Sequence, residues 1–170
     1  VNGGTNWSVT TVGLGSRFVY SMASPSTATN IVIAGTSGSG VYRSVNSGAT
    51  WNNPSTGLTN LDVRAVVINP VDPSNIFAGT NTGGVFMSND TGVSWSAVNT
   101  NLGNLQVRAL AMDPDGSNIY AGTRKGVYRS ATGTISWSQA NSGLSNTNVR
   151  SLTASLINPG TIFAGTLGGG

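Results

Sequence analysis

The sequence predicts an all-β protein of about four repeats, each a four-stranded antiparallel sheet of 42 to 44 residues. The Ala-Gly-Thr triplets recur at spacings of 44, 43 and 43 residues, beginning at Ala34, Ala78, Ala121 and Ala164. The tryptophans recur at spacings of 44, 44 and 42 residues, at Trp7, Trp51, Trp95 and Trp137. The intervening segments are short and rich in Val, Ile, Phe and Tyr, unlike a helical repeat. A period in the low forties with strand-like segments is typical of the blades of a β-propeller.

One repeat shows the expected order of elements. Its first strand, residues 63–69, is apolar on both alternating faces apart from Arg64, so we expect it to be buried on both sides. The turn that follows contains Pro70 and Pro73, and proline supplies no donor to continue a strand ladder. We then expect a second strand, a glycine-containing hairpin, a third strand, a tight loop and a short outer strand, at residues 76–80, 81–84, 85–88, 89–94 and 95–98.

We expect residues 1–170 to form one propeller-type domain with one blade divided between the two ends of the chain. Three repeats cover residues 17–60, 61–104 and 105–146. The fourth has its inner part at 147–170 and its outer part at 1–16. The register indicates this division, because Ser44 is the eighth residue after Thr36, whereas only four residues follow Thr166 before the pattern resumes at the first residue.

An open array of blades leaves unpaired strand edges, and such edges recruit partners. We therefore expect self-association edges at the two ends of the chain, at Val1, Asn2, Gly168, Gly169 and Gly170. Three outcomes fit the register: a four-bladed ring closed on itself, a fragment of a longer array, or a subunit whose divided blade is completed by another copy. Completion by other copies gives a ring or a filament, according to the rotation between copies.

The composition excludes several classes of function. The chain has no cysteine and no histidine, which excludes disulfides, thiolate zinc sites and catalysis by either side chain. Its eight lysines and arginines are scattered, so we expect no nucleic-acid partner. No apolar run approaches the roughly 20 residues of a membrane span. We expect no cofactor. A charged fraction of only 8% suits a secreted or cell-surface protein.

The tight loop after the third strand carries a family resemblance. Residues 88–95, SNDTGVSW, resemble the Asp-box, or bacterial neuraminidase repeat, with the pattern Ser-x-Asp-x-Gly-x-Thr-Trp. The matching positions in the four copies are Ser44, Asn46, Gly48 and Trp51; Ser88, Asp90, Gly92 and Trp95; Ser130 and Trp137; and Asn2, Gly4 and Trp7. The surrounding sequence is similar to propellers of the xyloglucanase, sortilin and photosystem-assembly-factor kinds.

The resemblance implies a structural hairpin at the rim of a propeller. The short Asp or Asn accepts hydrogen bonds from the amides of its own loop, the glycine takes a positive φ, and the tryptophan packs into the sheet. A platform on which sugars stack is the alternative role for the tryptophans. The acidic position is kept only at Asp90.

Enzymatic activity is not expected. Sialidases on similar propellers need a tyrosine activated by a glutamate, and this chain has no glutamate. The resemblance to xyloglucanases implies a pair of carboxylates across a cleft. The acids here are confined to loops, turns and one strand entry, at Asp62, Asp72, Asp90, Asp113 and Asp115.

Arginine recurs at one position of the first strand in three repeats, at Arg64, Arg108 and Arg150. If these strands line a central channel, the three guanidinium groups form a partial ring that attracts an anionic ligand. The alternative is that each arginine caps neighbouring carbonyls or packs its stem between blades. The first repeat has Tyr20 at this position.

These observations predict a non-catalytic extracellular scaffold or interaction protein, with other copies of itself as partners in a ring or filament. The alternative is a carbohydrate-binding propeller, or a non-catalytic fragment of a xyloglucanase-like glycoside hydrolase, with glycans as partners.

Overall fold

The structure is a computed structural model that describes residues 4–15, 18–27 and 30–168. These residues form thirteen β-strands in four antiparallel sheets and contain no helix. The predicted all-β fold of four-stranded antiparallel blades is therefore confirmed. The exact repeat boundaries given above stay a prediction.

The two interior sheets each have four strands. One contains β4 (Val63–Ile68), β5 (Ile76–Thr80), β6 (Val85–Ser88) and β7 (Ser96–Ala97). The other contains β8 (Val107–Met112), β9 (Asn118–Thr123), β10 (Gly126–Ala131) and β11 (Ser138–Gln139). The two end sheets are smaller in the described residues. They contain β1 (Val19–Ala23), β2 (Val32–Thr36) and β3 (Val41–Ser44) at one end, and β12 (Val149–Ala154) and β13 (Ile162–Thr166) at the other.

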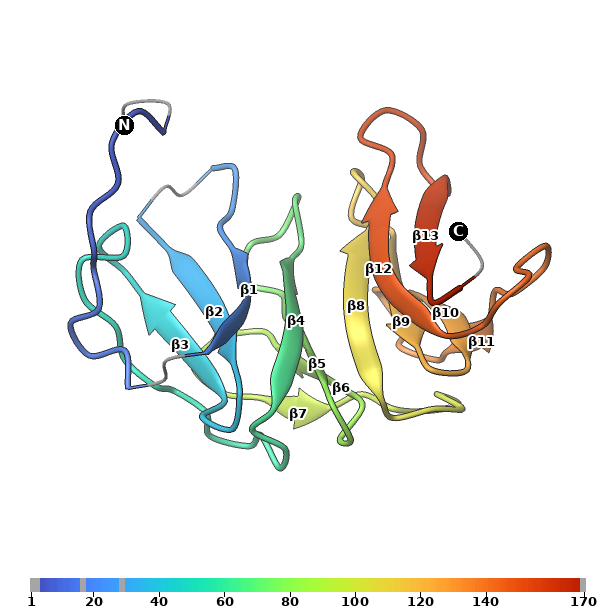
Figure 1. The fold of residues 1–170 in the computed structure, drawn as a ribbon, viewed down its shortest axis with the longest axis horizontal. Helices are drawn as coiled ribbons and strands as arrows, with labels where there is room; N and C mark the ends of the chain where they lie inside the picture. The colour runs from blue at the N-terminus through green and yellow to red at the C-terminus, as the bar shows by residue number, and fades with distance from the viewer. Residues whose placement is uncertain (1–3, 16–17, 28–29, 169–170) are drawn as a thin grey trace.

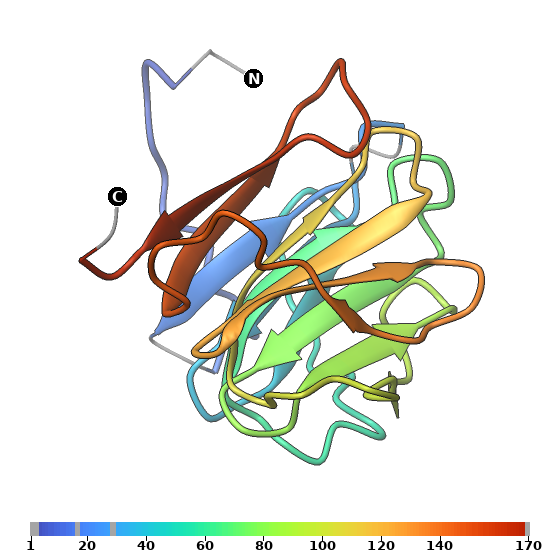
Figure 2. The ribbon, with the colours of Figure 1, turned by 90° about the vertical axis from the view of Figure 1, so that its right-hand side faces the viewer.

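The four sheets fan out in an open arc (Figure 1). The first strands of the sheets, β1, β4, β8 and β12, neighbour one another at the centre, and the later strands of each sheet lie toward the rim. Residues 4–15 lie beside the sheet of β1, whereas the β12–β13 hairpin closes the opposite end of the arc. Figure 2 faces that end and shows this hairpin on the outside of the fold. The two expected parts of the divided blade therefore lie at opposite ends of the arc.

The Ala-Gly-Thr triplet owes its regularity to contacts between sheets. A Cβ at Gly79 would lie 2.6 Å from a methyl group of Val107, and one at Gly122 would lie 2.7 Å from a methyl group of Val149. Glycine is therefore required for the first strand of the next sheet to approach. The threonine of the triplet closes the hairpin, as when the Thr80 hydroxyl donates to the Gly84 carbonyl at 3.0 Å.

The first strand of every sheet carries the same β-bulge. The pairing shifts directly after Val63, Val107 and Val149, and after Val19 in the first sheet. The bulged residues are Arg64, Arg108, Arg150 and Tyr20. A bulge turns a side chain away from the regular pleat. This irregularity therefore sets the direction of the recurring arginines.

The core lies between the sheets. Ile33 and Val41 of the first sheet pack against Val63, Val66 and Ile76 of the second. Equivalent clusters join the second sheet to the third and the third to the fourth. Each sheet is thus stabilised mainly by apolar contact with its neighbours along the chain.

Candidate functional site

The Asp-box loop at residues 88–94 is held together by its own hydrogen bonds. The Ser88 hydroxyl donates to Asp90 Oδ1 at 2.7 Å, and the amides of Val93 and Ser94 donate to the same oxygen at 2.9 Å. The hydroxyl hydrogen bonds from Ser88 and Ser94 hold the pKa of the Asp90 carboxyl well below its usual range. The carboxylate of Asp90 is thereby engaged within its loop.

The loop at residues 44–50 has the same geometry without the charge. Asn46 Oδ1 accepts from the Ser44 hydroxyl at 2.9 Å and from the Thr50 amide at 2.8 Å. The Gly48 amide donates to the Ser44 oxygen at 2.9 Å. In the third copy Ser130 accepts from the Ser136 amide at 2.9 Å, with no Asp or Asn between them. Hydrogen bonding within the loop is common to all three.

Three of the four repeated tryptophans are buried, and each joins its sheet to the preceding segment. The indole N–H groups of Trp51, Trp95 and Trp137 donate to the carbonyls of Thr10, Pro54 and Val98, at 3.3, 3.1 and 2.7 Å. Burial between segments leaves these rings no open face for a sugar. They act as joints between neighbouring repeats.

Trp7 is different, because 91% of its surface is exposed. Its ring lies 3.6 Å from the Cβ position of Gly4, as the Trp51 ring lies 3.7 Å from that of Gly48. The local loop geometry therefore exists at Trp7. The expected packing into a sheet is not met there, because no neighbouring sheet lies under the ring. Asn2 of this copy lies outside the described residues.

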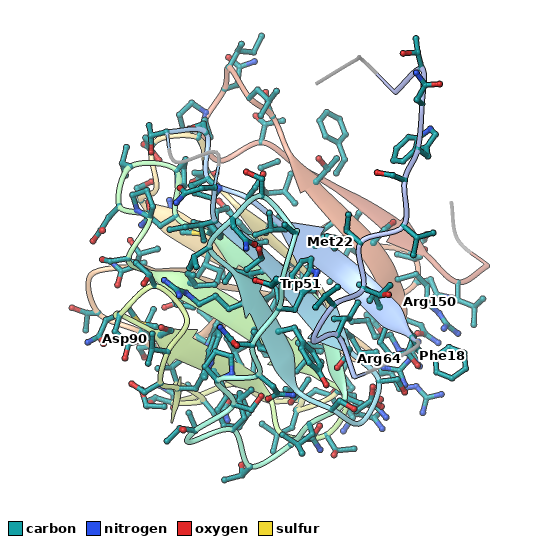
Figure 3. All side chains as sticks on the ribbon, turned by 90° about the vertical axis from the view of Figure 1, so that its left-hand side faces the viewer. Phe18, Met22, Trp51, Arg64, Asp90 and Arg150 are labelled. Carbon is teal, nitrogen blue, oxygen red and sulfur yellow. The ribbon has the colours of Figure 1, made fainter. Side chains whose placement is uncertain are left out.

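Large apolar side chains are exposed at both ends of the arc. Phe163 of β13 is 62% exposed, whereas Phe77, at the same position of β5, is fully buried. At the other end Met22 of β1 is 57% exposed, whereas its equivalent Val66 is 4% exposed. Figure 3 shows Met22 on the face of β1 that no other sheet covers. Sequence reasoning missed these residues, although superposing the repeats would have marked them as end positions.

A hollow of about 370 Å³ lies between the third and fourth sheets. The side chains of Leu144, Ile162 and Ala164 form its apolar wall, and Ala140 and Ser142 lie along the segment beside it. A second, more open hollow of about 460 Å³ lies near the ends of the central strands, between Met22, Met112 and Leu156. The first hollow is thus lined by two neighbouring sheets, and the second is lined by residues of all four.

Of the five residues predicted to form edges for self-association, only Gly168 lies within the described residues. Gly168 lies in a turn with φ of +82°. Val1, Asn2, Gly169 and Gly170 lie outside the described residues. Their role in self-association stays a prediction.

The three recurring arginines lie on adjacent central strands. Arg64 forms an ion pair with Asp62 at 2.8 Å and lies 4.3 Å from the centre of the Tyr20 ring. Arg108 donates to the neutral Asn148 side chain at 3.0 Å. Figure 3 shows Arg64 and Arg150 at the same edge of the fold, far from Asp90.

The positive charges in this row of three arginines, Arg64, Arg108 and Arg150, are not equally compensated by neighbouring groups. The hydrogen bond with Asp62 raises the pKa of the Arg64 guanidinium. Burial, followed by the charges of Arg150, Arg124 and Arg64, lowers the pKa of the Arg108 guanidinium. The row therefore carries excess positive charge around Arg108, as an anion site would need. A ligand for it stays a prediction.

The remaining aspartates brace turns. The Asp72 carboxylate accepts from the Ser74 hydroxyl at 2.6 Å, and Asp115 accepts from the Ser117 amide at 3.0 Å. Asp113 is buried and accepts from the Gly160 amide at 2.9 Å, which links the third sheet to the fourth. Sequence reasoning placed Asp113 in a turn but missed this link. Over the described ranges, no cluster of three or more acidic side chains suited to a metal ion occurs.

Within the same described ranges, no helix has the length and apolar character needed to cross a membrane.

The sequence matches the model of a known protein family. The model of the Sortilin-Vps10 family, described as sortilin, neurotensin receptor 3, matches residues 39–163. Among curated proteins, none matches the sequence.

Solved structures with the same fold include both natural and designed proteins. An ancestral GH74 enzyme is 25% identical, with a TM-score of 0.73, and the match covers 88% of this chain and 22% of that enzyme. The extracellular domain of a hybrid two component system from B. thetaiotaomicron is 15% identical, with a TM-score of 0.72 and coverage of 91% and 23%. This chain thus spans less than a quarter of either protein.

The computationally designed Ika4 protein is similar over nearly its whole length. It is 15% identical, with a TM-score of 0.68, and the match covers 93% of this chain and 91% of that protein. An identity this low shows the shared fold alone. The two folds are therefore of comparable size, since the match covers more than nine-tenths of each chain.

Proposed function

This chain belongs to the Sortilin-Vps10 family, and from that premise we propose that it is a non-catalytic extracellular interaction module that assembles with other copies of itself. The extracellular placement is supported by the likeness to the extracellular domain of a hybrid two component system and by the low fraction of charged residues in the chain. The non-catalytic role is supported by the aspartates, whose carboxylates are engaged in loops and turns.

One observation carries the proposal of assembly. Phe163 is exposed at a position where Phe77 and Tyr120 are buried against the next sheet. Burying a phenylalanine side chain contributes about 1.5–3 kcal/mol. Contact with a further sheet would therefore be favourable at this end.

The occupant that fits this end is the first sheet of a second copy. Inside the molecule, the face of Phe77 is covered by residues such as Val107 and Leu110 of the next first strand. The corresponding residues of β1 are Val19 and Met22, which are themselves exposed. The two ends therefore offer complementary faces, and the contact is head-to-tail.

Head-to-tail contact gives a closed ring or a filament, according to the rotation between copies. Two copies of four repeats would make about eight blades, the upper end of the usual range for propellers. Three copies would exceed that range. A two-copy ring is therefore the assembly that the fold favours.

The test is the mass of the 170-residue protein in solution, measured by sedimentation equilibrium over a range of concentrations. We expect multiples of the chain mass, and Phe163→Asp should shift the equilibrium to the monomer. Val93→Asp is the matched control, because Val93 is also exposed but lies in the loop between β6 and β7. A wild-type protein that stays monomeric at the highest concentration overturns the proposal.

Carbohydrate binding is the second candidate, and the exposed ring of Trp7 favours it. Its structural support is the likeness to a GH74 enzyme. Titration with xyloglucan oligosaccharides, followed by tryptophan fluorescence, tests it. Saturable binding that Trp7→Ala abolishes would support this function, and an unchanged spectrum would exclude it for these sugars.

A further inference from the structure

The three buried tryptophans follow one rule. Each indole N–H donates to the carbonyl three residues after the preceding tryptophan, at Thr10, Pro54 and Val98. Each tryptophan amide donates to the carbonyl five residues after the preceding tryptophan, at Val12, Thr56 and Thr100, over 2.9, 2.9 and 3.0 Å. The segment after one tryptophan is therefore the socket for the next.

The sixth residue after each tryptophan completes this socket. Gly13 and Gly57 have φ of +83° and +86°, and Asn101 has φ of +62°. The Cβ positions of both glycines fall on the carbonyl of the tryptophan that occupies the socket, Trp51 or Trp95. At the two glycine positions the backbone lies too close to the docked tryptophan for a side chain, whereas Asn101 donates from its side chain to the Ser136 hydroxyl beside the docked Trp137.

The segment after Trp137 is a socket without a tryptophan. Gly143 has φ of +83°, like Gly13 and Gly57, but no atom of the described residues lies within 4 Å of its Cβ position. The hollow of about 370 Å³ lies beside it. Its apolar wall includes Leu144, whose equivalents Leu58 and Leu102 pack in clusters with Trp95 and Trp137.

We infer that this hollow is the binding site for Trp7 of a second copy. The Trp7 indole N–H then donates to the Ala140 carbonyl, and its amide donates to the Ser142 carbonyl. Trp7 is already held against Gly4 in the loop geometry of the docked tryptophans. Little ordering is therefore needed on binding, which favours affinity. This inference rests on the proposed self-association and names its anchor.

A second contact has the same register. The triplet glycines Gly79 and Gly122 face Val107 and Val149 of the next first strand. Among the described residues, no valine lies within 4 Å of the Cβ position of Gly165, and its nearest neighbour is Ser151 of its own sheet. In the proposed joint Gly165 faces Val19 of the second copy. The Trp7 socket and this glycine therefore lie on the same open end and require the same occupant.

Disulfide trapping tests the joint directly, because the chain has no cysteine. Thr56 and Ser94 form a parallel bridge across an interior joint, and the corresponding residues are Ser142 and Asn6. Bridged strands lie about 4.8 Å apart, within the Cα range of a disulfide. The variant pair Thr56→Cys with Ser94→Cys, which closes within one chain, is the positive control for this geometry.

We mix the two single variants Asn6→Cys and Ser142→Cys under oxidising conditions. We expect a covalent species of two chains, one of each variant, in preference to species made from one variant alone. A random distribution among the three species overturns the inference. The double variant Asn6→Cys with Ser142→Cys gives a second test. If its disulfide forms within one chain and the mass does not increase, Trp7 fills the socket of its own chain and the inference is overturned.

The strength of the anchor is measured with Trp7→Ala. We expect the dissociation constant of self-association to rise roughly 30-fold, the effect of losing an interface hot spot. Val9→Ala is the matched control, since Val9 is exposed and its equivalents Asn53, Ala97 and Gln139 are exposed within the arc. If the wild-type protein associates but Trp7→Ala associates equally well, this inference fails and the proposed function stands. A monomeric wild-type protein contradicts both.

Discussion

Strands β5 and β13 have the same sequence, Ile-Phe-Ala-Gly-Thr, in different surroundings. All five residues of β5 are buried, because sheets cover both of its faces. None of the five residues of β13 is fully buried. The apolar pattern of the repeat is therefore suited to a neighbouring sheet on each side. The end strands keep this pattern where the described residues supply a neighbour on one side only.

The comparison of β5 with β13 shows which surfaces would gain free energy by binding another sheet. The interior sheets have already gained from apolar burial, whereas the two end sheets have gained on one face only. The tryptophans that hydrogen-bond to the preceding repeat show the same difference between interior and end positions. Trp51, Trp95 and Trp137 are docked, and Trp7 is exposed. Interior and end positions therefore form natural pairs for mutation.

The largest difference is expected between Phe77→Ala and Phe163→Ala. The first leaves a cavity in a closed core and should lower the free energy of unfolding by about 3–5 kcal/mol. The second removes a mostly exposed ring and should lower the free energy of unfolding of the monomer by less than about 1 kcal/mol. Urea denaturation at low protein concentration measures both. Equal losses would mean that β13 is covered in the single chain.

Gly57→Ala and Gly143→Ala form the second pair. Both positions have a positive φ, which costs an alanine about 1–2 kcal/mol. At Gly57 the added methyl group also clashes with the Trp95 carbonyl. The loss of free energy of unfolding should therefore be about 1–3 kcal/mol larger for Gly57→Ala than for Gly143→Ala. Thermal unfolding of the monomer measures the difference. Gly143→Ala should nevertheless weaken self-association, although less than loss of the Trp7 ring, because the equivalent Asn101 tolerates a side chain beside the docked Trp137. An unaffected assembly would count against the Trp7 joint.

Asp90→Asn makes one Asp-box loop resemble the loop of Asn46. The folded pKa of Asp90 lies below its unfolded value of about 3.9, so its stabilisation is present above about pH 4 and is lost as the pH falls further. Because the group is near solvent, we expect the variant to lose less than about 1 kcal/mol near neutral pH. This difference from the wild type should shrink steadily as the pH falls below about 4 toward the folded pKa. Urea denaturation from neutral pH to about pH 2.5 measures it, and a difference that does not shrink would point to a steric cause.

The smallest effect is expected in the arginine row. Arg64 has Asp62 as its counter-ion, whereas Arg108 donates to the neutral side chain of Asn148. Arg64→Gln should therefore destabilise the monomer by up to about 1 kcal/mol. Arg108→Gln should change its stability by less than about 0.5 kcal/mol, since it also relieves repulsion. Denaturation at low and high salt compares the two variants. A large loss at Arg108 would show that its stem, and not its charge, is the important part.

Much of the fold could be predicted because the signals are local. The strand at residues 63–68, the hairpin glycines and the loop around Asp90 depend on alternation and turn chemistry within a few residues. The bulge at Arg64 could not be predicted, since nothing in the residue pattern distinguishes a bulged pair from a regular one. The acceptors of the tryptophans, 39 to 41 residues away in the chain, were equally hidden.

The sequence by itself determined the repeat, its strands, its tight loops and the residues that face a neighbouring sheet. Only the tertiary structure decided which of those residues have a neighbour, because identical segments such as β5 and β13 differ in position along the arc and not in composition. The burial of a side chain depends on what packs against it, and the arc covers the interior faces while it leaves Met22, Phe163 and Trp7 exposed.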